Sequence, residues 1–226
     1  MFRSLVNWFR AENLLVQAKK KVLEMLKIVD ELFDDSVNLF WAGKGVSLDE
    51  LRKRDKKINH LVRDVRKKVL THLAFTGTSD LEMSLVMVNI VVFIERIGDY
   101  TKDIGYLSTE HPGTVNAAGM EDKVRAFEKD LGARLKTLVD IFSNGDEVGT
   151  SAMQLANTHK EMNTRYDELA HELLDPANNK LSPADSARLA LYLRYLRRIE
   201  GHVFNIASAE VNPFHRISFK VKKVSG

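Results

Sequence analysis

Apolar residues recur at alternating intervals of three and four positions along most of the chain. Between residues 15 and 39 one such line consists of Leu15, Ala18, Val22, Met25, Val29, Leu32, Ser36 and Leu39, and it is widened by Leu26, Phe33 and Phe40. This spacing is typical of a helix that packs in a bundle. The pattern predicts six long helices: 15–40, from Ser47 to near Gly77, from Ser79 to Leu107, 123–142, about 147–174, and from Ser182 to at least Ile206.

Short signals mark where these helices start and stop. Ser47 with Glu50, and Ser79 with Glu82, have the spacing of a capping box. Ser182 is followed by a proline and then by an acidic residue in the first turn, which is a further start signal. Glycines at 43–45, Pro112-Gly113, Asn144-Gly145 and the segment 175–179 predict the intervening loops.

The second half of the chain repeats the first at an offset of about one hundred residues. The matching segments are 55–59 with 159–163, Asp80 with Asp185, and 95–104 with 197–206. Each pair lies at the same place in its set of three predicted helices. The sequence therefore predicts an all-α fold of two tandem three-helix bundles, with the first repeat at 1–110, the second at 118–210 and a basic tail at 211–226.

Composition narrows the class of protein. The 226 residues include no cysteine, which excludes disulfides, thiolate metal sites and cysteine nucleophiles. A net charge of +3 is too small to indicate a nucleic-acid partner. The N-terminus lacks the continuous apolar run of a signal peptide, and the longest apolar run, Leu85 to Ile94, is too short to span a bilayer. We therefore expect a cytoplasmic protein.

Three acidic residues lie one turn apart on the third predicted helix. Glu95, Asp99 and Asp103 are spaced i, i+4, i+8 and so share one face, where like charges cost about a few tenths of a kcal/mol per pair. Arg96 and Lys102 are expected to point elsewhere on the helix. A bound cation would offset the repulsion, and carboxylates at this spacing suit Mg, Ca, Mn or Fe, with Zn also compatible. A solvated acidic end of a central helix is the alternative, and both interpretations remain open.

The segment Glu95-Arg96-Ile97-Gly98-Asp99, with Asp80-Leu81 fifteen residues upstream, resembles the third-helix signature of the PhoU family. The segment from Asp55 to Asn59 is similar to that family's second-helix motif. Residues 197–206 match the third-helix signature with substitutions, and the resemblance extends from about Leu14 to Glu210.

The resemblance implies a function. PhoU proteins consist of two three-helix bundles and are accessory regulators of phosphate uptake and phosphate-starvation signalling. They bind the ATPase of the phosphate transporter and a phosphate-sensing histidine kinase, restraining both. We accordingly expect a regulator and not an enzyme, a homodimer, and membrane association only through partners. A metal-dependent helical-bundle enzyme and a metal-free dimeric scaffold are the alternatives.

The resemblance also implies a metal site, because some members of the family bind iron or zinc clusters through Glu/Asp-x-x-x-Asp motifs. Carried over to this sequence, the ligands are Glu95, Asp99 and Asp103, with Asp55 and Asn59 as weaker candidates. The metal would be Fe, Zn, Mn or Mg, in one site in the N-terminal half.

The second half departs from the metal motif. Arg197 and Gly201 replace two of the three acids and only Asn205 keeps its place, although Glu200 and His202 lie nearby. A fixed positive charge opposes cation binding at short range, so a degenerate second site is predicted. The arginines at 194, 197 and 198 are compatible with ion pairs to another helix, with a bound anion, or with a solvated basic face, which is the preferred interpretation.

Other patterns add little chemistry. Glu168 and His171 form a single Glu-x-x-His, and no second copy is present to complete a di-iron site. No Walker loop or Gly-x-Ser-x-Gly elbow occurs. The N-terminal face of Phe2, Leu5, Val6 and Phe9 is expected to dock on the protein itself in preference to a membrane or partner. The alternating basic segment 217–224 is predicted to be extended, either as a partner arm or as a disordered tail.

Overall fold

A computed structural model of the chain describes residues 2–43, 45–110, 115–117, 119–144, 148–175 and 180–221, with side chains from Leu14 onward except those of Glu110 and Val148. It has six long α-helices, as predicted: α1 (Phe2–Ala42), α2 (Leu48–Thr76), α3 (Leu81–Glu110), α4 (Glu121–Asn144), α5 (Val148–Leu174) and α6 (Pro183–Val211). A 3₁₀ turn, η1 (Phe214–Arg216), follows α6. The predicted all-α fold is confirmed.

Most of the predicted helix ends are confirmed. The Ser47 hydroxyl accepts a hydrogen bond from the Glu50 amide (3.2 Å), and the Ser182 hydroxyl accepts one from the Asp185 amide (3.1 Å). The prediction that Ser79 caps α3 was wrong. Its hydroxyl donates to the Thr76 carbonyl (3.2 Å) and so belongs to the turn between α2 and α3. The turns at Gly145 and at 176–179 lie outside the described residues.

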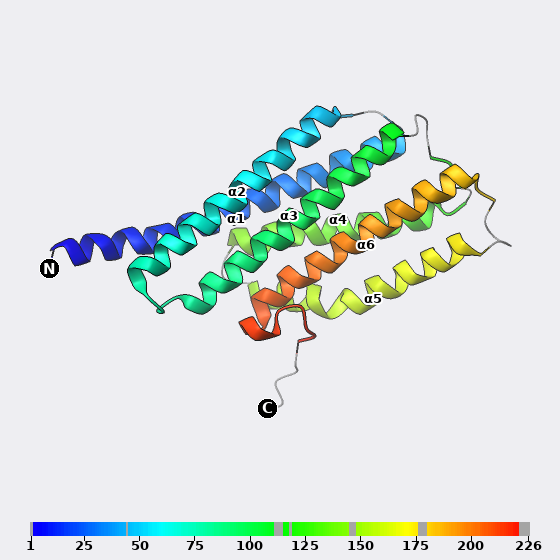
Figure 1. The fold of residues 1–226 in the computed structure, drawn as a ribbon. Helices are drawn as coiled ribbons and strands as arrows, with labels where there is room; N and C mark the ends of the chain where they lie inside the picture. Colours follow the sequence, from blue (N-terminus) through cyan, green and yellow to red (C-terminus); the bar gives the residue numbers. More distant parts are fainter. Residues whose placement is uncertain are drawn as a thin grey trace.

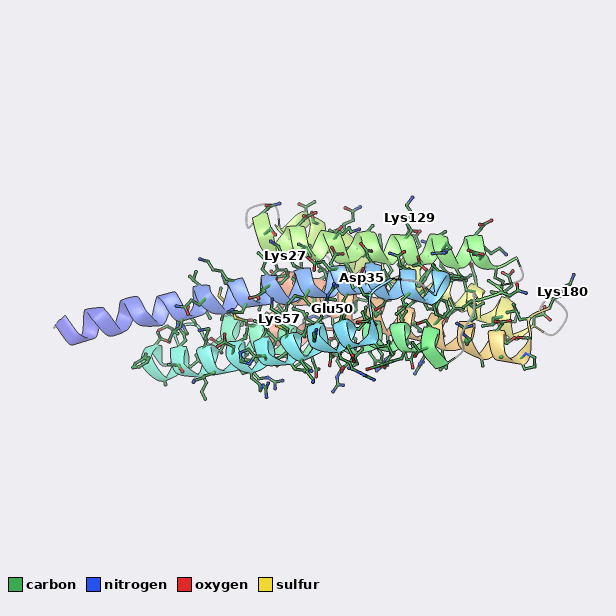
Figure 2. The ribbon with its side chains drawn as sticks, turned by 90° about the horizontal axis from the view of Figure 1, so that it is seen from above. Lys27, Asp35, Glu50, Lys57, Lys129 and Lys180 are labelled. Carbon is green, nitrogen blue, oxygen red and sulfur yellow. The ribbon has the colours of Figure 1, made fainter. Side chains whose placement is uncertain are left out.

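The six helices form two three-helix units that pack against each other along their length (Figure 1). Between the two units, α3 contacts α6 and α1 contacts α4, so that α1 lies between α2 and α4 (Figure 2). The buried apolar side chains of both units belong to one continuous core. Exposed charged residues such as Lys129 and Lys180 point outward from this assembly (Figure 2). The two three-helix units therefore share a single apolar core.

A buried polar contact lies at the centre of this junction. The Glu128 carboxylate of α4 accepts hydrogen bonds from the Trp41 indole of α1 (2.7 Å) and from the Tyr192 hydroxyl of α6. The Tyr192 ring also stacks on Phe40, with centroids 3.9 Å apart. Burial, together with the Glu128 carboxylate, raises the pKa of Tyr192 well above its ordinary value. The three helices are thus fixed in register by groups that water does not reach.

The two ends of the chain depart from the bundle in different ways. The first turns of α1 continue beyond the other helices (Figure 1), and the side chains of the predicted N-terminal apolar face lie outside the described residues. After α6 the chain folds back: the Ser218 amide donates to the Ser208 hydroxyl (2.9 Å), and the Asn212 amide group donates to the Phe219 carbonyl (2.9 Å).

The predicted extended conformation was therefore wrong for residues 217–219, because these hydrogen bonds hold a turn in which Ser218 adopts a φ of 70°. Residues 222–226 lie outside the described part. No helix in the described part of the chain combines the length and apolarity that crossing a membrane requires.

Candidate functional site

The five predicted metal ligands lie on α2 and α3, which pack against each other. Glu95, Asp99 and Asp103 are half-buried on α3, and Asp55 and Asn59 are half-buried on α2. Two glycines let the helices approach closely. A Cβ atom on Gly98 would lie 2.9 Å from Ile58 Cδ1, and one on Gly105 would lie 2.3 Å from Leu51 Cδ1. The glycine of the Glu95–Asp99 motif therefore brings the acids of the two helices to one interface.

A lysine lies between these acids. The Lys102 ammonium is 3.0 Å from Asp55 Oδ1 and 3.3 Å from Asp99 Oδ1. Burial alone would lower the pKa of Lys102, but the hydrogen bonds and charges of Asp55 and Asp99 outweigh it and raise that pKa above its ordinary value. The ammonium is therefore charged and links the two helices.

Arg96 completes the pairing of the acidic face. Its guanidinium lies 3.3 Å from Asp99 Oδ2 and 3.6 Å from Glu95 Oε2. The expectation that Arg96 and Lys102 point elsewhere was wrong, because side chains three positions apart on a helix are neighbours. Burial raises the pKa of Asp103; Lys102 opposes this rise, whereas the charges of Asp99 and Asp55 add to it.

The arrangement does not fit a metal ion as it stands. Among the described residues, no group of three or more His, Asp or Glu side chains is positioned to hold one. The Lys102 ammonium occupies the space between the carboxylates that a divalent cation would need. Metal binding at these residues stays a prediction, and it requires Lys102 to move away from Asp55 and Asp99.

Elemental analysis of purified protein tests that prediction. If Glu95, Asp99 and Asp103 hold Fe, Zn, Mn or Mg, the wild-type protein carries near-stoichiometric metal and Asp99→Ala loses most of it, because one of few anionic ligands is removed. Asp167→Ala, which removes an exposed acid of α5, is the matched control and should leave the metal content unchanged. Wild-type protein that remains metal-free after incubation with each of these ions would contradict the prediction.

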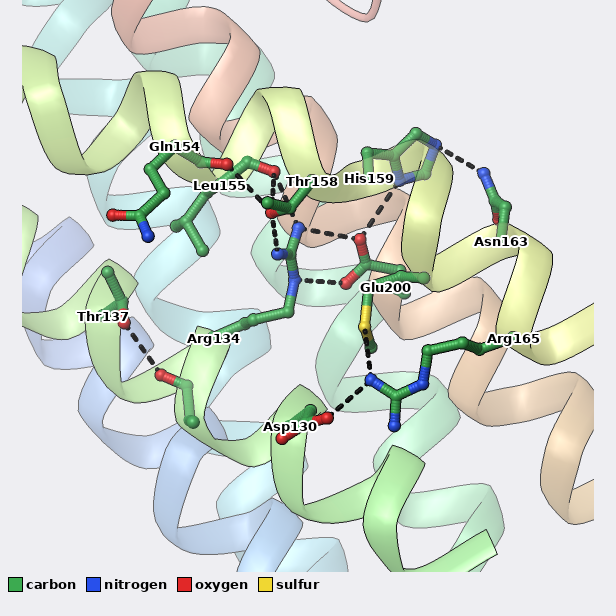
Figure 3. A network of polar contacts seen from close by, with 12 residues as sticks. Asp130, Arg134, Thr137, Gln154, Leu155, Thr158, His159, Asn163, Arg165 and Glu200 are labelled. Atoms are coloured by element: carbon green, nitrogen blue, oxygen red, sulfur yellow. Dashed lines mark hydrogen bonds and ion pairs between the residues drawn. The ribbon is translucent and has the colours of Figure 1, made fainter. Parts of the chain in front are cut away.

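The second unit holds a buried ion pair (Figure 3) whose carboxylate, Glu200, lies at the repeat position of Gly98. Arg134 of α4 donates to both carboxylate oxygens of Glu200 of α6, at 2.8 and 2.9 Å. Arg134 also donates to the Thr158 hydroxyl (2.7 Å) and to the Leu155 carbonyl (2.8 Å) of α5. Glu200 is 1% exposed and Arg134 is 8% exposed, so the pair joins all three helices away from water.

The histidine that replaces Asp55 in the repeat belongs to the same network. His159 Nδ1 lies 3.1 Å from the Glu200 carboxylate, and its Nε2 lies 2.9 Å from the Asn163 amide nitrogen (Figure 3). An imidazole that donates from Nδ1 and accepts at Nε2 satisfies both contacts. The positions of Asp55 and Asn59 in the first unit are thus taken in the second by His159 and Asn163, which belong to a hydrogen-bonded structural network.

Sequence reasoning did not identify Arg134, Glu128 or Tyr192 as important. A signal was present, because Glu128 and Arg134 interrupt the apolar line of α4, which is formed by Val124, Phe127, Leu131, Leu135, Leu138 and Ile141. A charge in such a stripe is buried and therefore needs a partner. The identity of the partner depends on packing between distant helices.

The degenerate site itself carries three arginines on α6. Arg197 pairs with Asp167 Oδ1 of α5 at 2.9 Å, and Arg198 donates to the Tyr100 hydroxyl of α3 at 3.1 Å. The predicted pairing of an α6 arginine with another helix is therefore present for Arg197, although Asp167 is largely exposed. Arg194 is exposed, one turn before Arg198 on the same helix.

Known proteins resemble this chain over most of its length. Residues 22–107 match the PhoU domain, a span that includes the second half of α1, all of α2 and most of α3. The phosphate-specific transport system accessory protein PhoU homolog of Synechocystis is 24% identical over 204 residues, covering 87% of each chain.

Two solved structures share the fold. The phosphate transport system regulatory protein PhoU from Streptococcus pneumoniae superposes with a TM-score of 0.75 at 17% identity, covering 89% of this chain and 95% of that one. PhoU from Pseudomonas aeruginosa gives a TM-score of 0.77 at 22% identity, with 88% and 96% covered. The six-helix fold is therefore that of PhoU. The domain match over residues 22–107 and the similarity to the Synechocystis protein add a likeness in sequence to PhoU proteins.

Proposed function

We propose that this protein is a cytoplasmic accessory regulator of phosphate uptake and phosphate-starvation signalling, and that it acts by binding the phosphate transporter ATPase and the sensor kinase. The observation that carries the proposal is the similarity over 87% of the chain to a phosphate-specific transport accessory protein. The PhoU domain match and the shared fold support it. The action is binding alone, in agreement with the regulatory character of the family, and requires no catalytic step.

Deletion of the gene tests the regulatory role. In phosphate-rich medium the deletion strain should take up radiolabelled phosphate faster than the wild type and express phosphate-starvation genes, because the restraint on transporter and kinase is removed. Expression of the chain from a plasmid should restore both. Unchanged uptake and unchanged gene expression in the deletion strain would refute the proposed function.

Exposed apolar side chains on both sides of the turn between α2 and α3 support a protein-binding role. They are Leu70, Phe75, Leu81, Met83 and Leu85, with exposed fractions between 36% and 71%. Exposed apolar groups gathered at one place are typical of protein-binding surfaces. We call this set the α2–α3 apolar tip.

Charged residues at the α2–α3 apolar tip should abolish partner binding. Replacing Leu70 and Phe75 with lysine places two charges in an apolar contact, where losing their bound water costs free energy. We therefore expect the full-length variant to lose the transporter ATPase from pull-downs. The matched control is Leu174→Lys, since Leu174 is 76% exposed at the end of α5, far along the sequence from the tip. Equal recovery of the ATPase by wild type and the tip variant would exclude this surface.

A further inference from the structure

A polar pocket of about 660 Å³ lies beside the α6 arginines and against α5. Its described lining includes Arg194, Arg197 and Arg198, together with the neutral groups His202, Asn163 and Asn205. None of the residues that line it is an aspartate or a glutamate. The pocket therefore combines three permanent positive charges with uncharged hydrogen-bonding groups.

The positive charge of the pocket is only partly compensated. Arg197 has an ion-pair partner, Asp167, but that carboxylate is 63% exposed, so water screens the interaction. Arg198 donates to the neutral Tyr100 hydroxyl, which leaves its charge uncompensated. In the described part of the chain no carboxylate pairs with Arg194 or Arg198 within 4.0 Å. At least two guanidinium charges are thus available to a ligand.

The three arginines border one pocket, with the Arg197 guanidinium over Tyr166 of α5 and the Arg198 guanidinium over Tyr100 of α3. Positions 194, 197 and 198 are spaced i, i+3 and i+4, so the three side chains share one face of α6. Gly201 continues that face without a side chain, and a Cβ atom built there would have no neighbour within 4 Å. The glycine that replaces the second acid of the repeat therefore leaves open the space that the arginines border.

An unpartnered buried atom lies at the same pocket. His202 Nδ1 is buried and has no hydrogen-bond partner within the described residues. Burial, together with the charges of Arg198 and Arg96, lowers the pKa of His202 to about 4, so its ring is neutral near pH 7. A buried polar atom without a partner costs free energy unless a ligand or water satisfies it. The nitrogen of a neutral imidazole can be satisfied either as a hydrogen-bond donor or as an acceptor, depending on the tautomer.

We propose that this pocket is a binding site for phosphoryl anions, held by the guanidinium groups of Arg194, Arg197 and Arg198. Arginine matches phosphate oxygens with pairs of parallel hydrogen bonds, and several arginines around one cavity favour a multiply charged oxyanion over a single carboxylate. Inorganic phosphate and a linear polyphosphate share this chemistry, and the volume admits more than one phosphoryl group. The proposal goes beyond the regulatory role and does not depend on it.

Isothermal titration calorimetry of the full-length protein tests the site, with inorganic phosphate and tripolyphosphate as ligands and sulfate as a comparison at constant ionic strength. We expect saturable one-to-one binding of at least one phosphoryl ligand, with sulfate weaker. Arg194→Ala with Arg198→Ala should weaken it about tenfold or more, since two charge-assisted contacts are lost. Tighter binding of tripolyphosphate would assign the pocket to a phosphate chain, and similar affinity for both would assign it to free phosphate.

Two further variants make the result specific. Arg63→Ala with Arg66→Ala removes the same charge from the exposed face of α2 and should leave the affinity unchanged, which controls for net charge. Gly201→Glu places a carboxylate in the open space, keeps all three arginines, and should abolish binding even if the double alanine variant fails to fold. Absence of phosphate and tripolyphosphate binding to the wild type, equal affinity for sulfate, or unaltered affinity in Gly201→Glu would overturn the proposal.

Discussion

Replacing Glu200 with alanine should lower the free energy of unfolding by about 3–5 kcal/mol, which is the cost of removing one partner of a buried ion pair. The substitution leaves the Arg134 guanidinium 8% exposed and without its carboxylate. An arginine cannot lose its proton in response. His159 loses the same partner at Nδ1. Urea unfolding followed by circular dichroism measures the effect.

A second variant separates the missing charge from the missing side chain. Arg134→Met combined with Glu200→Leu removes both charges and keeps apolar volume, so it should recover most of the stability lost in Glu200→Ala. The matched surface control is Asp167→Ala, which breaks the exposed pair with Arg197 and should cost less than about 1 kcal/mol. A loss of under 1 kcal/mol in Glu200→Ala would show that the pair is not buried in solution.

Replacing Gly105 with alanine should destabilise the protein by about 1–3 kcal/mol, the usual range for overpacking a core. The new methyl group would lie 2.3 Å from Leu51 Cδ1 and 3.4 Å from Ser36 Oγ. Leu51 is fully buried, so its side chain must change rotamer or α2 must shift away from α3. Thermal unfolding at neutral pH gives the measurement.

Gly201→Ala is the matched control, because Gly201 also lies inside a long helix but a Cβ there meets nothing within 4 Å. That substitution should stabilise the protein by up to about 1 kcal/mol through helix propensity alone. If both alanine variants shift stability in the same direction and by the same amount, close packing at Gly105 does not explain its presence.

Sequence patterns predicted the fold well because each helix carries its own signal. The three-four spacing located all six helices, and Ser47, Ser182 and Gly77 fixed three of their ends through local hydrogen bonds or backbone conformation. The pattern failed where tertiary contacts decide. Ser79 has the spacing of a cap, yet its hydroxyl binds within the preceding turn. Residues 217–219 belong to a segment that alternates like a strand, yet the side chain of Asn212 and the hydroxyl of Ser208 hold them in a turn.

The candidate site was predictable in position but not in chemistry. Spacing alone placed Glu95, Asp99 and Asp103 on one face, and the resemblance to the PhoU family added Asp55 as a weaker candidate. The sequence did not reveal that the Lys102 ammonium reaches both Asp55 and Asp99, because a long flexible side chain can adopt many rotamers. The Glu200–Arg134 pair depended on the packing of α4 against α6, which no local pattern encodes.

The continuous core has a consequence for how the chain can be divided. The PhoU domain match ends at residue 107, close to the end of α3, which suggests a convenient place to truncate. A fragment cut there would uncover the faces of α1 and α3 that contact α4 and α6, and would leave Trp41 without Glu128. Residue 107 is therefore the end of a sequence match and not of a packed unit, and we expect a stable fold only when α4 and α6 are present.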